Sequence, residues 1–199
     1  MLTGERQFTV ADLENFPDDG NRYEVIDGEL YVTTAPHFEH QFALNQVGVA
    51  LTAWSNATGL GWTFPGVGVI FAANAGVVPD LIWISAERLS VITDNPRTGR
   101  RDGKFYAAPD LVVEVLSPGR DNEARDREIK LTLYSRRGVR EYWIVDRFTQ
   151  RVEVFRRNAQ AALELAATLT VGDAVSSPLL PDFALPVEQI FRLPEGLLD

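Results

Sequence analysis

The chain contains no cysteine, which excludes disulfide bonds and thiolate-ligated zinc. It has no apolar run near the roughly 20 residues that a membrane-spanning helix requires. Residues 1–10 show no signal-peptide pattern. We therefore expect a cytoplasmic protein without a membrane partner. Only two histidines are present, His37 and His40, and no third nitrogen or sulfur ligand is available to complete a zinc site with them.

Lysine is scarce, and the basic charge is unevenly distributed. Of the 19 basic residues, only Lys104 and Lys130 are lysines. The net charge of −9 argues against indiscriminate nucleic-acid binding. Yet residues 97–157 carry 15 basic and 10 acidic groups (+5), whereas residues 1–96 carry 3 and 12 (−9) and residues 158–199 carry 1 and 6 (−5). The basic middle segment suits a polyanionic substrate, although a solvated helix face with a charged loop would look the same.

The order of the predicted elements indicates one α/β domain over residues 1–199, with a mixed sheet flanked by helices. Two strands flanking Asp27-Gly28 predict an N-terminal β-hairpin. Helical periodicity predicts a helix over about 36–57 that ends at Gly59, and another from about 122 to Gly138. Further strands are expected at 62–71, 77–85, 111–116, 139–146 and 151–157, with one or two more in the tail.

Glu114 is the most informative residue, because its neighbours Leu111 to Leu116 otherwise read as a fully buried strand. A buried carboxylate is costly unless a partner compensates it. Asp80, embedded in the predicted strand 77–85, and Lys130, on the next helix, are candidate partners. Two strand-borne carboxylates and an ammonium group suit a Mg²⁺-dependent phosphodiesterase. A buried acid paired with a helix lysine for stability alone fits the spacing equally well.

Five sequence blocks in this order resemble the Uma2 family of the PD-(D/E)xK nuclease superfamily, whose members are usually described as restriction endonucleases. The resemblance covers residues 8–192. The blocks are Tyr23 to Leu30, Val78 to Leu81, Pro109 to Pro118, Lys130 with Tyr134, and Gly138 to Asp146.

The resemblance implies a restriction-endonuclease-like core, and it implies that Asp80 and Glu114 are metal ligands and Lys130 the catalytic lysine. The usual Glu-x-Lys pattern would place the lysine at position 116, where this chain has Leu116. The reading therefore moves the lysine onto the following helix. The expected activity is a Mg²⁺- or Mn²⁺-dependent DNA endonuclease, with a homodimer as the expected assembly. The alternative is a non-catalytic protein-interaction module on a nuclease scaffold.

Four further residues are candidates for the site. Glu24, in the first matching block, could supply a third metal carboxylate or be a surface acid on a half-buried strand. His40 could contact phosphate or water. Arg120 and Arg125 could bind phosphate, although each also fits a solvated helix face.

Overall fold

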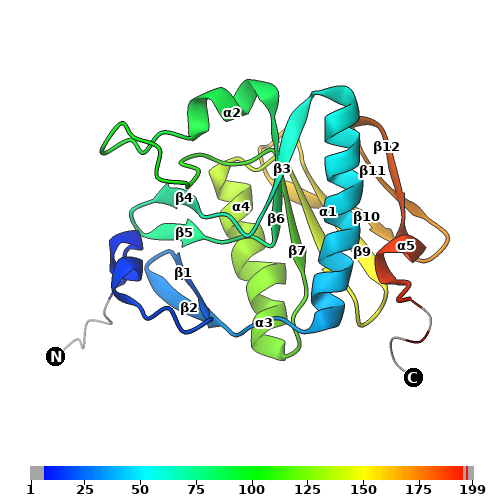
Figure 1. Ribbon diagram of the computed structural model, residues 1–199, viewed down its shortest axis with the longest axis horizontal. Helices are drawn as coiled ribbons and strands as arrows, with labels where there is room; N and C mark the ends of the chain where they lie inside the picture. The colour runs from blue at the N-terminus through cyan, green and yellow to red at the C-terminus, as the bar shows by residue number, and fades with distance from the viewer. Residues whose placement is uncertain (1–6, 195, 197–199) are drawn as a thin grey trace.

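The computed structural model describes residues 7–194 and 196. Its centre is a six-stranded sheet with the order β10-β9-β8-β7-β6-β3; Figure 1 labels β3, β6, β7, β9 and β10 of this sheet. In chain order these strands are β3 (Gly61–Pro65), β6 (Leu81–Ser85), β7 (Leu111–Val115), β8 (Glu141–Asp146), β9 (Arg151–Arg157) and β10 (Leu163–Leu169). Only β7 and β8 are parallel, and every other neighbouring pair in this sheet is antiparallel. The sheet is therefore mixed, as the sequence predicts.

The parallel pair needs a crossover connection, and one continuous helical stretch provides it. This stretch consists of α3 (Arg120–Ala124), a π-helical turn η2 (Arg125–Lys130) and α4 (Leu131–Arg137). It ends at Gly138, whose left-handed backbone (φ 92°) caps α4. The predicted helix from about 122 to Gly138 is thus confirmed, and it carries Lys130 back across the sheet.

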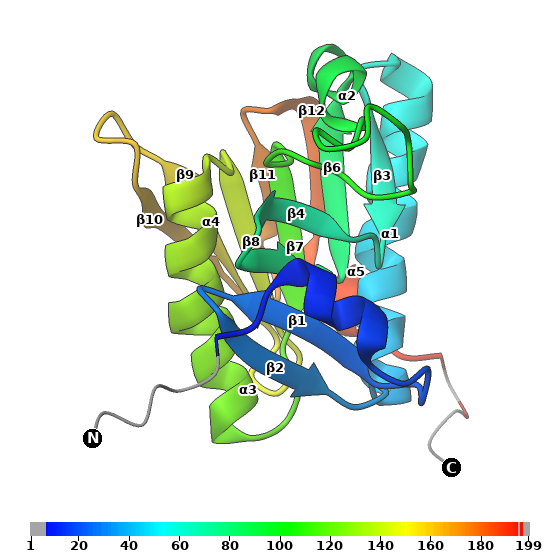
Figure 2. The ribbon, with the colours of Figure 1, turned by 90° about the vertical axis from the view of Figure 1, so that its left-hand side faces the viewer.

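A second sheet has four strands in the order β2-β1-β5-β4. They are β1 (Arg22–Ile26), β2 (Glu29–Thr33), β4 (Val69–Ala72) and β5 (Ala75–Val77). Asp27 and Gly28 both have positive φ (52° and 87°), as a tight two-residue hairpin turn requires. The predicted N-terminal hairpin is therefore confirmed. Figure 2 shows this small sheet in front of the large one, beside α4.

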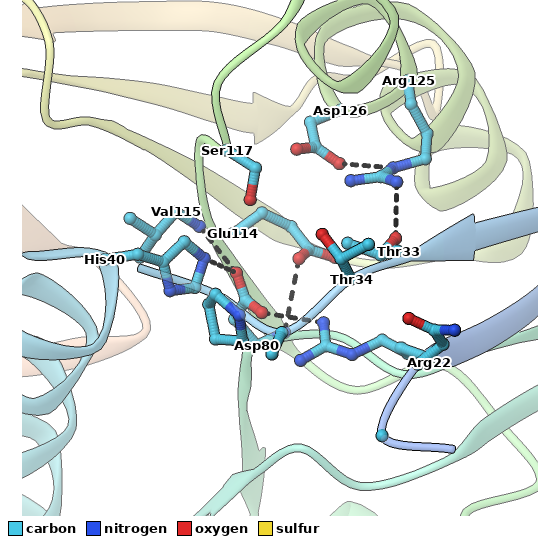
Figure 3. Close-up of a pocket in the computed structure, with 14 residues that line it drawn as sticks. Arg22, Thr33, Thr34, His40, Asp80, Glu114, Val115, Ser117, Arg125 and Asp126 are labelled. Atoms are coloured by element: carbon cyan, nitrogen blue, oxygen red, sulfur yellow. Dashed lines mark hydrogen bonds and ion pairs between the residues drawn. The ribbon is translucent and has the colours of Figure 1, made fainter. Parts of the chain in front are cut away.

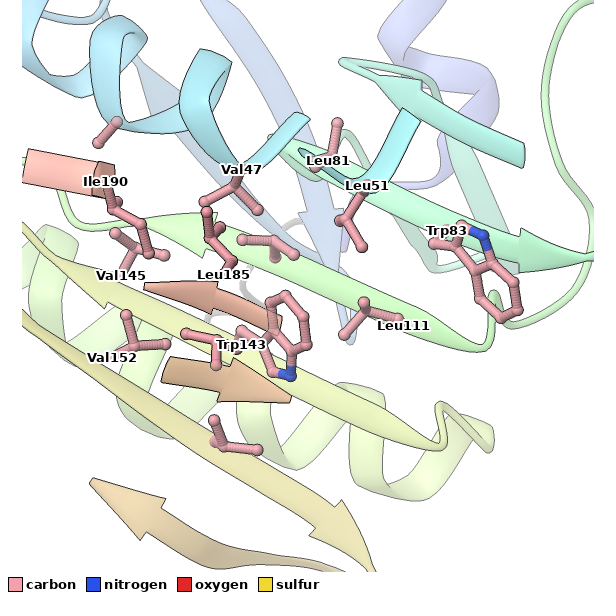
Figure 4. Packing of buried hydrophobic residues seen from close by; sticks show 14 of the residues in the cluster. Val47, Leu51, Leu81, Trp83, Leu111, Trp143, Val145, Val152, Leu185 and Ile190 are labelled. Carbon is pink, nitrogen blue, oxygen red and sulfur yellow. The ribbon is translucent and has the colours of Figure 1, made fainter. Parts of the chain in front are cut away.

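Strand alternation divides the core between the two faces of the large sheet. On one face, Trp83, Leu111 and Trp143 pack under α1 (Phe38–Thr58), which ends at Gly59 (φ 69°) as expected; Figure 4 shows this packing. On the other face, Ile82, Val112 and Tyr142 pack against α4 and the small sheet. Glu114 alternates with Val113 and Val115, so it points to the α4 face.

The C-terminal tail completes the α1 face. It forms β11 (Ala174–Ser177), β12 (Leu180–Pro186) and α5 (Val187–Phe191). Phe183, Leu185 and Ile190 are buried in the same cluster as α1. The apolar tail therefore docks on the core of its own chain. The remaining short helices are η1 (Val10–Asn15) and α2 (Ala86–Ile92).

Two strand predictions were wrong in their extent. The segment predicted as one strand over 62–71 forms two strands, β3 in the large sheet and β4 in the small one. The segment predicted over 77–85 likewise divides into β5 in the small sheet and β6 in the large one. Gly66 adopts a left-handed backbone (φ 57°) that breaks the first, and Pro79, which lacks an N–H group, interrupts the second. Asp80 therefore lies where the chain crosses between the sheets, not inside a continuous strand.

The predicted domain spans residues 1–199. Its first and last residues lie outside the described part of the chain, which omits 1–6, 195 and 197–199. Within the described ranges, none of the helices combines the length and apolar character needed to cross a bilayer.

Candidate active site

Asp80 and Glu114 face each other at one end of the large sheet. The antiparallel register of β6 and β7 pairs Leu81 with Val113, so the next position outward sets Asp80 beside Glu114. The Asp80 backbone N–H donates to Glu114 Oε2 (3.3 Å), and the Val115 N–H donates to Asp80 Oδ2 (2.9 Å). Two carboxylates 34 residues apart in sequence are thus fixed by the sheet ladder itself.

Glu114 is bound from the helical side by Lys130 and Tyr134. The Lys130 Nζ lies 2.9 Å from Glu114 Oε1, and the Tyr134 hydroxyl donates to the same oxygen at 2.8 Å. All three side chains are almost completely buried. The expected contact between the helix lysine and the strand acid is therefore present. Both donors hold Oε1, which leaves Oε2 as the oxygen on the Asp80 side.

The π-helical turn determines which side chains of this helix face inward. Over residues Arg125–Lys130 the helix is wider than an α-helix, a feature that is frequent at functional sites. Arg125, Asp126 and Lys130 are all buried within this one turn. Lys130 Nζ lies 3.9 Å from Asp126 Oδ1. The alternating charges of Arg125–Lys130 are typical of a solvent-exposed helix in sequence, yet part of this segment is buried in the protein.

Strand β1 clamps the crossing segment that carries Asp80. Glu24 Oε1 accepts from the Val78 backbone N–H (2.8 Å) and lies 3.1 Å from Lys130 Nζ. Two residues earlier on the same strand face, Arg22 Nη1 donates to the Val78 carbonyl (3.0 Å) and to Asp80 Oδ1 (2.8 Å). The hairpin therefore positions both the acid and the lysine.

A cavity of about 130 Å³ opens beside the two carboxylates. Figure 3 shows Asp80 and Glu114 within it, with His40, Arg22 and Arg125 around them. Its lining also includes Thr33, Thr34, Ser117 and Asp126. Glu24 and Lys130 do not line it; they lie behind Glu114. The cavity thus presents carboxylates and guanidinium groups together.

The two facing carboxyl groups have opposite pKa shifts. Burial alone would raise the pKa of Asp80, but the hydrogen bond and charge of His40, with Arg22 and Lys130, hold it below its ordinary value. Burial raises the pKa of Glu114 to about 8; Lys130 opposes this, while Asp80 and other nearby acids add to it. Without further positive charge, one carboxylate of the pair is stable as an anion and the other retains a proton near neutral pH.

The lysine remains charged despite its burial. Burial lowers the pKa of Lys130, but the charges of Glu114, Glu24 and Asp126 outweigh this and raise it above its ordinary value. Burial, with the Glu114 charge, raises the pKa of the Tyr134 hydroxyl well above its ordinary value. Lys130 is therefore a permanent internal cation and Tyr134 a permanent hydrogen-bond donor.

The residues predicted from sequence come together except for one. Asp80, Glu114, His40 and Arg125 line the cavity. Glu24 and Lys130 form the layer behind it. Arg120 is exposed at the first position of α3 and is not part of the lining. His40 Nε2 lies 3.1 Å from Asp80 Oδ2, so this histidine contacts an acid of the site, while its Nδ1 is buried without a hydrogen-bond partner among the described residues.

Sequence reasoning missed two members of the site, Arg22 and Asp126. Arg22 begins an exposed-looking hairpin strand 58 residues before its partner Asp80, and no local pattern connects them. Asp126 lies between two arginines, as on a solvated helix. The one available signal was the position of Arg22 two residues before Glu24, which puts both on one face of β1.

The donor set of the cavity fits a hard divalent cation. Within residues 7–194 and 196, no three histidine and carboxylate groups are already arranged as a metal cage. Mg²⁺, however, is usually held by one or two carboxylates together with water and substrate phosphate oxygens. Asp80 and Glu114 supply these two carboxylates. The cluster has four acids (Glu24, Asp80, Glu114, Asp126) and three arginine and lysine cations (Arg22, Arg125, Lys130), so ionisation of Glu114 gives it one negative charge in excess, which a divalent cation would balance.

The mixed sheet, its crossover helix and the N-terminal hairpin together form the restriction-endonuclease-like α/β fold that the sequence predicts. The chain belongs to the Uma2 family, described as "Putative restriction endonuclease", whose family model matches residues 10–188. No curated protein matches the sequence.

A solved structure has the same fold. It is the 1.96 Å crystal structure of a "putative nuclease belonging to DUF820" from Anabaena variabilis ATCC 29413. The two chains are 19% identical and superpose with a TM-score of 0.72, over 92% of this chain and 97% of that chain. The likeness confirms the predicted restriction-endonuclease-like fold.

Proposed function

We propose that this protein is a divalent-metal-dependent endonuclease that hydrolyses phosphodiester bonds of DNA at the cavity beside Asp80 and Glu114. The observation that carries the proposal is the pairing of these two acids across β6 and β7, with Lys130 and Tyr134 on the far oxygen of Glu114. Membership of a family described as restriction endonucleases, and likeness to a structure described as a nuclease, support it.

Asp80 and Glu114 would hold Mg²⁺ or Mn²⁺ through oxygens that face the cavity. A bound divalent ion would polarise the phosphoryl oxygen and lower the pKa of an attacking water. Its positive charge would also favour the ionised form of Glu114, whose proton burial otherwise stabilises. Glu24, the third predicted carboxylate ligand, contacts Lys130 and Val78; we assign it the positioning of these two groups.

Lys130 lies behind Glu114 rather than in the cavity. We therefore propose that it orients the nucleophilic water through Glu114, whose carboxylate it holds in a single orientation together with Tyr134. Arg125, which donates to Thr33 Oγ1 at 2.7 Å, would contact a phosphate inside the cavity. His40 would fix the orientation of Asp80, and the exposed Arg120 would contact the DNA backbone outside the cavity.

The test is calorimetric titration with Mn²⁺ beside a plasmid cleavage assay, for wild type, Asp80→Asn and Glu114→Gln. We expect wild type to bind Mn²⁺ and cut the plasmid, and both variants to lose binding and cleavage together. A matched control is Asp110→Asn. Asp110 is equally buried at the other end of β7 and accepts from the Ser85 backbone N–H (2.9 Å), so its loss should lower stability and leave Mn²⁺ binding intact.

Folded wild-type protein that binds no Mn²⁺ at millimolar concentration would refute the proposal. It would favour the alternative of a protein-interaction module built on a nuclease scaffold. If the protein cleaved RNA and not the plasmid, the proposed metal-dependent hydrolysis would stand and only the proposed substrate would change. The predicted homodimer, the usual assembly for cutting both strands, is checked by sedimentation of the same samples.

A further inference from the structure

Among the described residues that line the cavity, Arg22 is the arginine that forms an ion pair with Asp80. Its Nη1 lies 2.8 Å from Asp80 Oδ1, while the other oxygen, Oδ2, is taken by His40 Nε2 and the Val115 N–H. The guanidinium therefore neutralises the same carboxylate that a metal ion would need. Its side chain is 29% exposed, in contrast to 5% for Asp80, so it can move where Asp80 cannot.

We propose that Arg22 is an exchangeable internal counter-ion: it occupies Asp80 in the metal-free protein, is displaced when a divalent cation binds, and then binds a substrate phosphate. The inference rests on the proposed function and adds a residue that neither the sequence motifs nor the family resemblance assigns. It makes metal binding and substrate binding depend on one another through a single side chain.

The electrostatics favour an exchange over coexistence. A divalent ion on Asp80 Oδ1 would place two positive charges next to the guanidinium, and like charges at contact distance repel strongly in a partly buried site. Asp80 cannot move aside, because its carboxylate and backbone are held by Val115, His40 and Glu114. Arg22 can, because its remaining anchor is one neutral carbonyl, that of Val78 (3.0 Å).

After its displacement from Asp80, the guanidinium group of Arg22 would remain at the cavity, on the side of Arg125. Arg22 pairs with Thr33 across the hairpin, and Thr33 Oγ1 accepts from Arg125 Nη1 at 2.7 Å. Two guanidinium groups, that of Arg22 from the hairpin and that of Arg125 from the π-helical turn, therefore line one cavity (Figure 3). Arginine recognises phosphate through paired N–H donors. Once free of Asp80, Arg22 would offer such a pair beside Arg125.

The first test measures Mn²⁺ affinity by calorimetry for wild type, Arg22→Gln and Arg22→Lys. Removing a competing unit charge next to a divalent ion should tighten binding by about tenfold or more, so Arg22→Gln should bind Mn²⁺ more tightly than wild type. Arg22→Lys keeps the competing charge and should stay within about threefold of wild type. A circular dichroism melt of each variant checks that it is folded.

Arg147→Gln is the matched control. Arg147 makes an ion pair of the same length with Glu39 (2.8 Å) and does not line the cavity. Its loss should leave Mn²⁺ affinity within about twofold. If folded Arg22→Gln binds Mn²⁺ no more tightly than wild type, while Asp80→Asn abolishes binding, the exchange is refuted and the metal site stands. If neither wild type nor Arg22→Gln binds Mn²⁺, the proposed function itself fails.

The second test addresses the phosphate role. In Ca²⁺, which occupies oxygen sites, fluorescence anisotropy would follow the binding of a short single-stranded DNA oligonucleotide. Arg22→Gln should bind it about tenfold more weakly than wild type, although the variant binds metal more tightly. Equal oligonucleotide affinity in the two proteins would overturn the phosphate role. These opposed shifts, tighter metal and weaker DNA, are not what a purely structural arginine would produce.

Discussion

Lys130→Met removes the internal cation of the site while keeping the length of its side chain. The ammonium group lies 2.9 Å from Glu114, 3.1 Å from Glu24 and 3.9 Å from Asp126, and the side chain is 1% exposed. Breaking a buried ion pair from one side typically costs about 3–5 kcal/mol, because the remaining charges lose their compensation. The free energy of unfolding of a domain is usually about 5–15 kcal/mol in total. The variant should therefore still fold, but with much of its stability lost.

Urea unfolding followed by tryptophan fluorescence measures this loss. With an m-value of about 2 kcal/mol/M, the expected cost lowers the midpoint by about 2 M. The loss should be greatest above pH 8 and smaller near pH 5.5, because a protonated Glu114 needs no counter-ion. Adding Glu114→Gln to the lysine variant should restore part of the loss, since it removes one of the uncompensated charges.

The chain offers a matched control in its only other lysine. Lys104 is partly exposed, so Lys104→Met should change stability by no more than about 0.5 kcal/mol. A cost below about 1 kcal/mol for Lys130→Met at pH 8 would refute the reasoning. It would mean that the surrounding acids are protonated or hydrated and do not depend on the lysine.

Three further predictions concern stability, each measured by urea unfolding. Burial raises the pKa of Glu114 from 4.5 to about 8, so the contribution of this residue to the free energy of unfolding is complete below pH 4.5 and is lost as pH rises through about 8. In EDTA the urea midpoint of wild type should therefore fall between pH 6 and 9. Glu114→Gln should flatten this dependence of the midpoint on pH, and an unchanged dependence would contradict the prediction. Ser55→Ala deprives the buried Trp83 Nε1 of its acceptor at 3.0 Å and should cost about 1–3 kcal/mol; a neutral result would mean that water replaces the hydroxyl. Gly61→Ala would put a methyl group 2.3 Å from the Ile84 carbonyl oxygen and should cost about 1–3 kcal/mol or more, whereas a silent change would show that β3 shifts freely at the sheet edge.

The sequence reveals those residues of the site whose type stands out from that of their neighbours in the chain. Glu114 stands out because a single acid interrupts an apolar strand, and the two-fold alternation of that strand fixes its face. Lys130 stands out because lysine is rare in this chain, and helical spacing from Leu133 and Tyr134 turns it toward the sheet. Both could be placed without coordinates, because one element determines each.

The parts that sequence does not reveal depend on contacts between distant elements. Arg22 acquires its role only when the small sheet docks against the large one, 58 residues along the chain from Asp80. Asp126 looks solvated because its burial is set by a π-helical turn, which has no reliable sequence signal. The division of 62–71 and 77–85 between two sheets likewise follows from packing, although Gly66 and Pro79 mark the breaks in retrospect.

The widened turn over Arg125–Lys130 has a consequence for how such sites change during evolution. A π-helical turn accommodates one residue more than the α-helical turn that it replaces, and successive residues of an α-helix are rotated by about 100°. A single insertion or deletion in this turn before Lys130 would therefore rotate Arg125 and Asp126 relative to α4, whereas Lys130, in helical register with Leu133 and Tyr134, would stay beside Glu114. The distance along the chain between acid and lysine is thus free to drift in related proteins, and a search based on fixed spacing would overlook those that preserve the arrangement only in space.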